Sequence, residues 1–113
     1  MDSQMQYLKE VTETVADFKK ELPEAFAAQS AFNDAVYKDG ALSTKIKRLM
    51  AMAIAIRVGC PGCITFQTNL ALEAGATKEE VVEAASVATS MGGTSANAWV
   101  WVVVQMLKEL GKW

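Results

Sequence analysis

Helix start and stop signals divide the 113-residue sequence into six segments, and this division constrains the fold more than any other feature. The stop signals are the glycines at 40, 59, 75, 92, 93 and 111. Between them, apolar residues recur at spacings of three and four, whereas the alternating pattern of strands is scarce. The sequence therefore predicts an all-α fold of about six helices, in one domain that covers residues 1–113.

Capping residues give the approximate bounds of these helices. The expected helices cover residues 4–21, 23–40, 44–58, 60–75, 78–91 and 94–110. Ser3, Ser43 and Cys60 stand at N-cap positions, and Thr77 with Glu80 has the spacing of a capping box. The residues expected to anchor the second helix in the core are Phe26, Phe32, Val36 and Tyr37.

The third and sixth helices are apolar beyond one face, most clearly over residues 49–56 and 99–107. A helix that is apolar all round must be buried on every side, and so small a domain cannot surround two of them. Both runs fall well short of the ~20 residues that cross a bilayer, so no membrane span is expected. We therefore expect the excess apolar surface to be buried between subunits of a homo-oligomer.

Composition disfavours several classes of function. The formal net charge is −2, from 11 basic and 13 acidic side chains, and this balance argues against a nucleic-acid partner. Histidine is absent and only two cysteines are present, whereas a zinc site needs about four ligands, so no metal is expected. The N-terminal residues 1–4 have no signal-peptide pattern, which predicts a cytoplasmic protein.

Both cysteines belong to one motif, Cys60-Pro61-Gly62-Cys63, at the start of the fourth helix. Cys60 at the N-cap and Cys63 at the third helical position would lie near unpaired N–H groups and the positive end of the helix dipole. This environment lowers thiol pKa values and favours the reactive thiolate. The motif therefore indicates a redox-active dithiol, and the alternative is two buried, inert thiols that fill a helix junction. A thioredoxin-like fold is disfavoured because the βαβ pattern is missing.

Two further side chains are candidates for supporting roles. Gln67 lies one helical turn after Cys63, and Arg48 would reach Gln67 if the third and fourth helices form a hairpin about Gly59. A guanidinium near a thiol stabilises the thiolate without accepting a proton. The alternatives are that Gln67 satisfies a helix–helix contact, and that Arg48 is solvated or paired with acidic residues of the first helix.

Four segments carry a resemblance to a known family: LSTK at 42–45, GCPGC at 59–63, LALEAGAT at 70–77 and MGG at 91–93. In this order and spacing they resemble the AhpD-like alkylhydroperoxidase and carboxymuconolactone decarboxylase family, over about residues 42–107. The resemblance implies an all-helical, AhpD-like fold and oligomers, commonly trimers or hexamers. It also implies a thiol peroxidase without a cofactor, whose disulfide is re-reduced by a protein dithiol such as a lipoyl domain.

The resemblance assigns roles by position. Cys63 matches the family's peroxide-reacting cysteine, and Cys60 matches its resolving cysteine. The family's proton-relay histidine falls at Gln67 and its relay glutamate falls at Arg48, so both halves of the relay are replaced in this chain.

Two main hypotheses follow. The first is a thiol–disulfide oxidoreductase with peroxidase-type chemistry. The second is a non-catalytic oligomeric scaffold or redox sensor that has lost the relay. A decarboxylase-type activity is disfavoured, because such members generally lack the CxxC motif.

Overall fold

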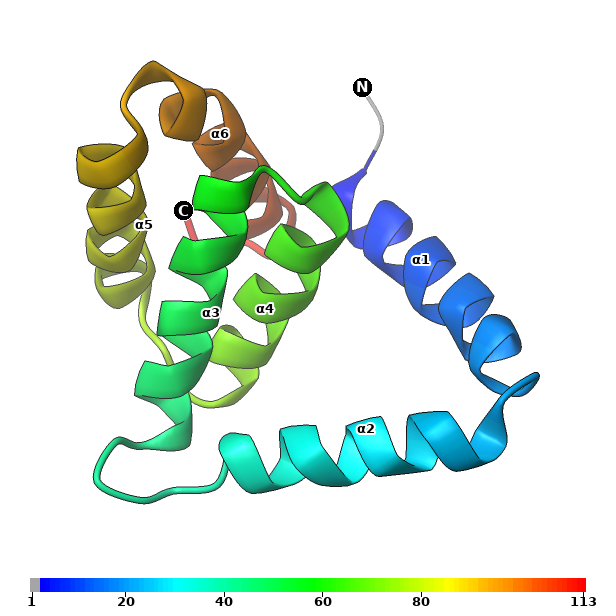
Figure 1. The fold of residues 1–113 in the computed structure, drawn as a ribbon. Coiled ribbons are helices and arrows are strands. Elements are labelled where there is room, and N and C mark those ends of the chain that lie inside the picture. Colours follow the sequence, from blue (N-terminus) through cyan, green and yellow to red (C-terminus); the bar gives the residue numbers. More distant parts are fainter. Residues whose placement is uncertain (1–2) are drawn as a thin grey trace.

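The computed structural model of the chain describes residues 3–113. It consists of six helices connected by short turns, with no strand among the described residues (Figure 1). The helices are α1 (Gln4–Lys19), α2 (Pro23–Val36), α3 (Thr44–Val58), α4 (Pro61–Glu73), α5 (Lys78–Gly92) and α6 (Thr94–Glu109). The predicted all-α fold with the CxxC motif at the start of the fourth helix is therefore confirmed.

The capping residues act as the sequence predicts. The side chains of Ser3, Ser43 and Thr77 each accept a hydrogen bond from the N–H group three residues later, and Glu80 completes the capping box with Thr77. The ends of the helices are less well predicted, since α2 stops at Val36 rather than near residue 40.

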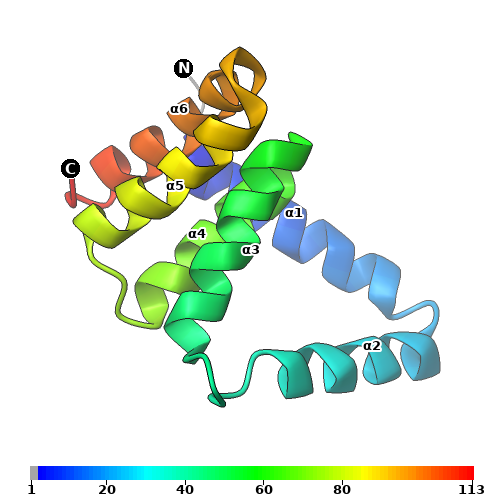
Figure 2. The same cartoon turned by 60° about the vertical axis from the view of Figure 1, so that its left-hand side comes forward.

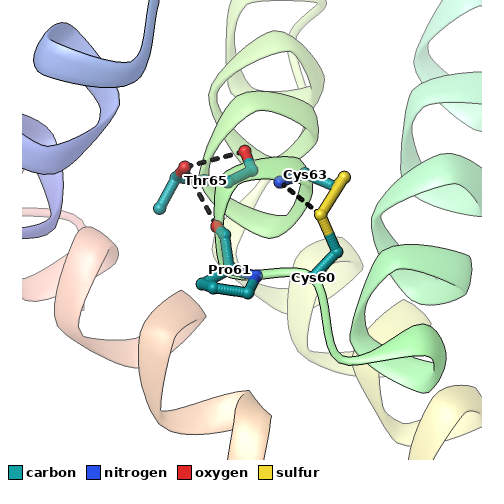
Figure 3. Close-up of a disulfide and its surroundings, with 5 residues drawn as sticks. Cys60, Pro61, Cys63 and Thr65 are labelled. Carbon is teal, nitrogen blue, oxygen red and sulfur yellow. Dashed lines mark hydrogen bonds between the residues drawn. A yellow bond between two sulfur atoms is a disulfide. The ribbon is translucent and has the colours of Figure 1, made fainter.

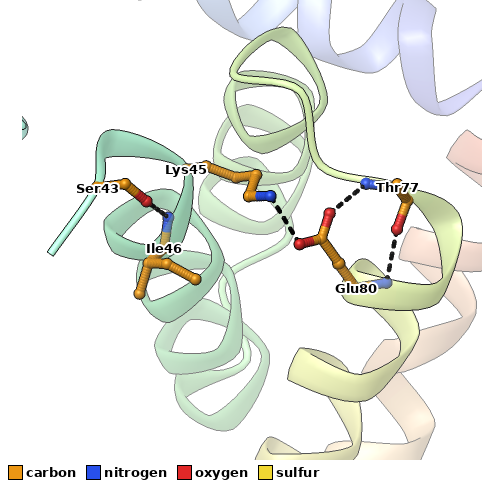
Figure 4. A network of polar contacts seen from close by, with 5 residues as sticks. All are labelled: Ser43, Lys45, Ile46, Thr77 and Glu80. Carbon is orange, nitrogen blue, oxygen red and sulfur yellow. Dashed lines mark hydrogen bonds and ion pairs between the residues drawn. The ribbon is translucent and has the colours of Figure 1, made fainter.

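A polar network attached to this capping box joins α3 to α5 (Figure 4). The Lys45 amine lies 2.7 Å from Glu80 Oε2, while Glu80 Oε1 accepts the Thr77 N–H at 2.9 Å. The hydrogen bond from Lys45, with that from Thr77, lowers the pKa of the Glu80 carboxyl. This network fixes the start of α5 against the start of α3.

The core lies between α3, α4, α5 and α6, which pack against one another as one body (Figures 1 and 2). Its fully buried larger side chains come from α3, α4, α5 and α6 and are Met52, Ile56, Ile64, Val81, Val102, Val103, Met106 and Leu107. The first turns of α1 join this body through Leu8 and through Glu109, which accepts hydrogen bonds from the N–H groups of Gln4 and Met5. Glu109 also accepts one from the Ser3 hydroxyl.

Helix α2 stands away from the core, and with α1 and α3 it outlines an open triangle (Figures 1 and 2). The predicted core anchors of α2 are therefore wrong, because none of its residues is buried and Phe32 is 68% exposed. Phe26 packs edge-to-face against the Phe18 ring of α1, and Tyr37 stacks on Arg48. Apolar spacing shows that α2 has a face to bury, but not that its own chain buries it.

Helix α3 is likewise not buried on every side within the single chain. Four residues at a spacing of four form an exposed line, which we call the α3 stripe: Ile46, Met50, Ile54 and Val58. Ile54 is 61% exposed and Val58 is 72% exposed. The single chain thus leaves one side of α3 uncovered, as the sequence predicts for an apolar excess. The expected excess is smaller on α6, where Trp101 is exposed but Val102, Val103, Met106 and Leu107 are buried.

None of the helices in residues 3–113 is both long enough and apolar enough to span a bilayer.

Candidate functional site

Cys60 and Cys63 form a disulfide at the start of α4 (Figure 3). Their Cα atoms are 5.2 Å apart, within the range that a disulfide requires. Cys60 is the N-cap residue, Pro61 follows at the first helical position, and Cys63 is the third helical residue. This is the placement that the sequence predicts for both cysteines.

The turn before the disulfide depends on Gly59. Gly59 ends α3 with φ at +80°, in the left-handed region where a side chain is strained. A Cβ on Gly59 would also lie 2.8 Å from Nε1 of Trp99, which comes from α6. The close approach of α6 therefore holds this turn, and with it Cys60, in one position.

The first turn of α4 is held by Thr65, which the sequence analysis did not single out. The Thr65 hydroxyl is buried and donates to the carbonyl oxygens of Pro61, at 3.2 Å, and Gly62, at 3.0 Å (Figure 3). A threonine after a CxxC motif gives no signal of this role by itself, because the same residue would serve equally well in an ordinary core position.

The two sulfur atoms lie in different surroundings. The N–H group of Cys63 donates to Sγ of Cys60 at 3.2 Å (Figure 3). Cys60 is half-buried, whereas Cys63 is exposed. The burial that the alternative of two inert thiols assumes is therefore not found at Cys63.

Two pockets meet at Cys63. The first, about 520 Å³, lies beside α3 and is lined by both cysteines, Gln67, and apolar side chains that include Met50 and Ile54. The second, about 650 Å³, lies between α1, α2 and α4 and is lined mainly by apolar residues of these helices, with Cys63, Thr12, Lys19 and Gln29. Cys63 is thus accessible from apolar space on two sides.

The structure brings Arg48 and Gln67 together at this site. A guanidinium N–H of Arg48 donates to Oε1 of Gln67 at 3.0 Å, and the guanidinium carbon lies 3.5 Å from the centre of the Tyr37 ring. Arg48 therefore contacts Gln67 and Tyr37, and not the acidic residues of α1. Neither an amide nor a guanidinium accepts a proton near neutral pH, so this pair supplies hydrogen bonds and positive charge but no base.

Lys47, a cation that lines the first pocket, is held by backbone carbonyl groups at the end of α2. The Lys47 amine donates to the carbonyl oxygens of Val36, at 2.8 Å, and Lys38, at 2.6 Å, at the end of α2. Within residues 3–113, no group of three or more His, Cys, Asp or Glu side chains lies close enough together to hold a metal ion.

The chain is an all-helical protein with a CxxC disulfide at the start of its fourth helix. Comparison of its sequence with known families shows which family of such proteins it belongs to. The profile of the carboxymuconolactone decarboxylase family matches residues 23–105, and the chain therefore belongs to that family. The match begins at α2, earlier than the segment that the family motifs mark in the sequence.

Solved structures of family members share the fold. A carboxymuconolactone decarboxylase family protein from Legionella pneumophila is 36% identical, with a TM-score of 0.89 over 96% of this chain and 97% of its own. A Thermotoga maritima member, for which a part in the antioxidative response has been suggested, is 25% identical with a TM-score of 0.81 over 93% of this chain and 90% of its own.

Two curated relatives are uncharacterised proteins. One, from Cupriavidus necator, is 40% identical over 70 residues, which is 59% of this chain and 62% of the relative. The other, protein 4 in the cox locus of Paracoccus denitrificans, is 36% identical over 80 residues, which is 71% of this chain and 72% of the relative.

Proposed function

We propose that this protein is a thiol–disulfide oxidoreductase that reduces organic hydroperoxides through Cys63 and Cys60. The observation that carries the proposal is the Cys60–Cys63 disulfide, with Cys63 exposed where two apolar pockets meet. A two-residue spacing closes too small a loop to stabilise the fold appreciably, so redox cycling is the better reason for the pair.

The reaction has an oxidative and a reductive half. The Cys63 sulfur attacks the terminal oxygen of the hydroperoxide, the O–O bond breaks, and Cys63 sulfenic acid and the alcohol are formed. Cys60 then attacks the Cys63 sulfur, which closes the disulfide and releases water. An external dithiol supplies two electrons and two protons to restore both thiols. The apolar pocket walls suit an organic hydroperoxide better than hydrogen peroxide.

Arg48 and Gln67 are supporting residues in this proposal. The hydrogen bond from Arg48 occupies Oε1 of Gln67 and leaves the amide nitrogen of Gln67 as the end free to donate. Gln67 lies one turn after Cys63 on α4, and both residues line the first pocket. The pair thus favours negative charge on sulfur and does not relay a proton.

The electron donor that fits this site is a protein dithiol such as a lipoyl group on its carrier domain. A dithiol can displace Cys60 from the disulfide and then close its own disulfide, so both electrons come from one donor. The reducing cytoplasm is the compartment in which such a donor keeps the pair cycling, and we place the protein there.

We further propose that the protein works as a homo-oligomer, a trimer or hexamer. Met50, Ile54 and Val58 of the α3 stripe, with Val36 of α2, line the first pocket and are exposed in the single chain. A second copy packed on this face would bury the apolar excess and complete a wall of the pocket beside the disulfide.

Turnover with a small dithiol tests the enzyme. Reduced protein is supplied with cumene hydroperoxide and dihydrolipoamide, and peroxide loss is followed for the natural chain, Cys63→Ser and Cys60→Ser. We expect turnover only in the natural chain, with a single sulfenic acid formed in Cys60→Ser. Peroxide loss that is unchanged in Cys63→Ser would refute the proposal.

A specific observation favours one alternative, a redox sensor or non-catalytic scaffold. Arg48 and Gln67 form a hydrogen bond where the resemblance places a base and its acidic partner. A sensor would form the disulfide at a rate no greater than that of a simple thiol and would change its assembly when it does so. Equal assembly of the oxidised and reduced proteins would argue against the sensor.

A further inference from the structure

The two sulfurs of the disulfide differ in access. Cys63 is exposed and lines both pockets, whereas Cys60 is half-buried and lines only the first. A thiolate that opens a disulfide must approach one sulfur from the side opposite to the other sulfur. Cys63, which is exposed and borders both pockets, therefore offers the more open approach.

The two sulfurs also differ in how well their surroundings stabilise a negative charge. Pro61 has no N–H group, so the first N–H groups of α4 without a helical carbonyl partner are those of Gly62 and Cys63. The Cys63 amide donates to Sγ of Cys60 at 3.2 Å, and Cys60 stands at the N-cap. A thiolate on Cys60 would keep this hydrogen bond and face the positive end of the helix dipole.

We propose that a reductant attacks Sγ of Cys63 and that Cys60 leaves as the thiolate. The reductant's thiolate forms a new S–S bond with Cys63 while the Cys60–Cys63 bond breaks, and the electron pair of the broken bond goes to Sγ of Cys60. A second reductant thiol then attacks the reductant's own sulfur, forms the reductant disulfide and releases Cys63, which takes up a proton. This inference rests on the thiol–disulfide exchange proposed above and assigns the two sulfurs within it.

The assignment also provides the base that the Arg48–Gln67 pair lacks. After reduction, Cys60 is a thiolate beside the Cys63 thiol, and it accepts the Cys63 proton as Cys63 attacks a hydroperoxide. The proton then passes to the departing alkoxide. Cys60, again a thiolate, closes the disulfide by attack on the Cys63 sulfenic acid, and the departing hydroxide takes a proton from solvent to form water. In this order of events Cys60 acts first as a base and then as the resolving nucleophile.

Trapping of the mixed disulfide tests the inference on the natural chain. Oxidised protein is mixed with excess glutathione, quenched in acid within seconds and treated with N-ethylmaleimide. Both cysteines lie on the tryptic peptide 58–78, and fragmentation across Pro61-Gly62 shows which one carries glutathione. We expect glutathione on Cys63 and maleimide on Cys60, in at least about tenfold excess over the reverse.

The other outcomes are distinguishable. Glutathione mainly on Cys60, or an even distribution, would overturn the inference and leave the proposed oxidoreductase standing. A disulfide that glutathione does not open at all would count against both.

A second measurement uses the single variants as a matched pair. Thiolate absorbance near 240 nm is compared at pH 7 for Cys63→Ser, which keeps Cys60, and Cys60→Ser, which keeps Cys63. We expect at least about a threefold larger thiolate fraction in Cys63→Ser, because the residue 63 amide still donates to Cys60. A larger fraction in Cys60→Ser would contradict the inference, and circular dichroism confirms that both variants fold.

Discussion

At the scale of single residues, the proposed redox function depends on which atoms surround each sulfur. Sγ of Cys60 accepts an amide hydrogen bond, Cys63 is open to two pockets, and Arg48 faces Gln67 where a proton relay would need an acid and a base. In the proposed mechanism these contacts stabilise charge on sulfur, and proton transfer is left to the cysteines themselves.

Restoring the relay tests this view. Gln67→His alone is expected to raise the rate of peroxide reaction less than about threefold, because Arg48 beside the new imidazole disfavours its protonation. Gln67→His with Arg48→Glu should raise the rate at least about tenfold, since general base catalysis typically contributes more than this. Stopped-flow peroxide kinetics measure both rates, with Arg48→Glu alone as the control. A full gain from Gln67→His alone would show that Arg48 does not govern this position.

Gly59 gives a test of the turn that carries Cys60. Gly59→Ala combines left-handed backbone strain with a contact of 2.8 Å to the Trp99 ring and should lower the free energy of unfolding by about 2–4 kcal/mol. Gly75→Ala is the matched control, because Gly75 has φ at +96° but nothing within 4 Å of a Cβ. It should cost only about 1 kcal/mol. Urea denaturation gives both values, and equal losses would mean that the Trp99 contact adds nothing.

Glu109 determines how α1 responds to pH. Burial raises the pKa of this carboxyl, but the hydrogen bonds from Ser3, Gln4 and Met5 together outweigh burial and lower the pKa below its ordinary value. A depressed carboxyl pKa contributes stability above the unfolded-state value, and this stability is lost as the pH falls through the folded-state value.

Glu109→Gln should therefore weaken the docking of α1 near neutral pH and reduce the loss of stability below about pH 5. Amide exchange at residues 6–10 reports the docking, and unfolding free energies between pH 7 and pH 3 report the slope. Lys112→Ala, a change at an exposed neighbouring position, serves as the control. An unchanged acid slope in Glu109→Gln would exclude Glu109 as its source.

At the scale of elements, local chemistry made the helix starts predictable. Ser3, Ser43 and Thr77 satisfy amides three residues away, so their effect can be inferred from neighbours in the sequence. Trp99 contacts Gly59 from 40 positions away, and Glu109 accepts a hydrogen bond from Ser3, 106 positions away. The sequence near a tryptophan or a glutamate does not indicate such a distant partner.

The burial of α2 is less predictable for a different reason. Its apolar spacing indicates a face that needs cover, but Phe32 and Val36, expected as anchors in the core, are exposed in the single chain. Periodicity gives the amount of apolar surface and its direction on a helix, and it carries no information about which chain covers that surface.

At the scale of the whole molecule, the apolar excess on α2 and α3 predicts assembly. Ile54→Lys should dissociate the proposed oligomer without unfolding the chain, because Ile54 is 61% exposed in the single chain. Met91→Lys on α5 is the matched control, since Met91 is 74% exposed and lines neither pocket at the disulfide. Light scattering after size exclusion gives the mass. A monomeric natural chain, or an Ile54→Lys variant of unchanged mass, would refute an interface at the α3 stripe.

One measurement tests the central claim most directly: the single reaction of fully reduced protein with one equivalent of cumene hydroperoxide, quenched at intervals by alkylation and followed by intact mass. The account predicts rapid loss of two hydrogens through the Cys60–Cys63 disulfide, at a rate at least about tenfold above that of free cysteine, and its absence in Cys63→Ser. Disulfide formation no faster than the oxidation of free cysteine would contradict the enzyme assignment and leave a sensor or a scaffold.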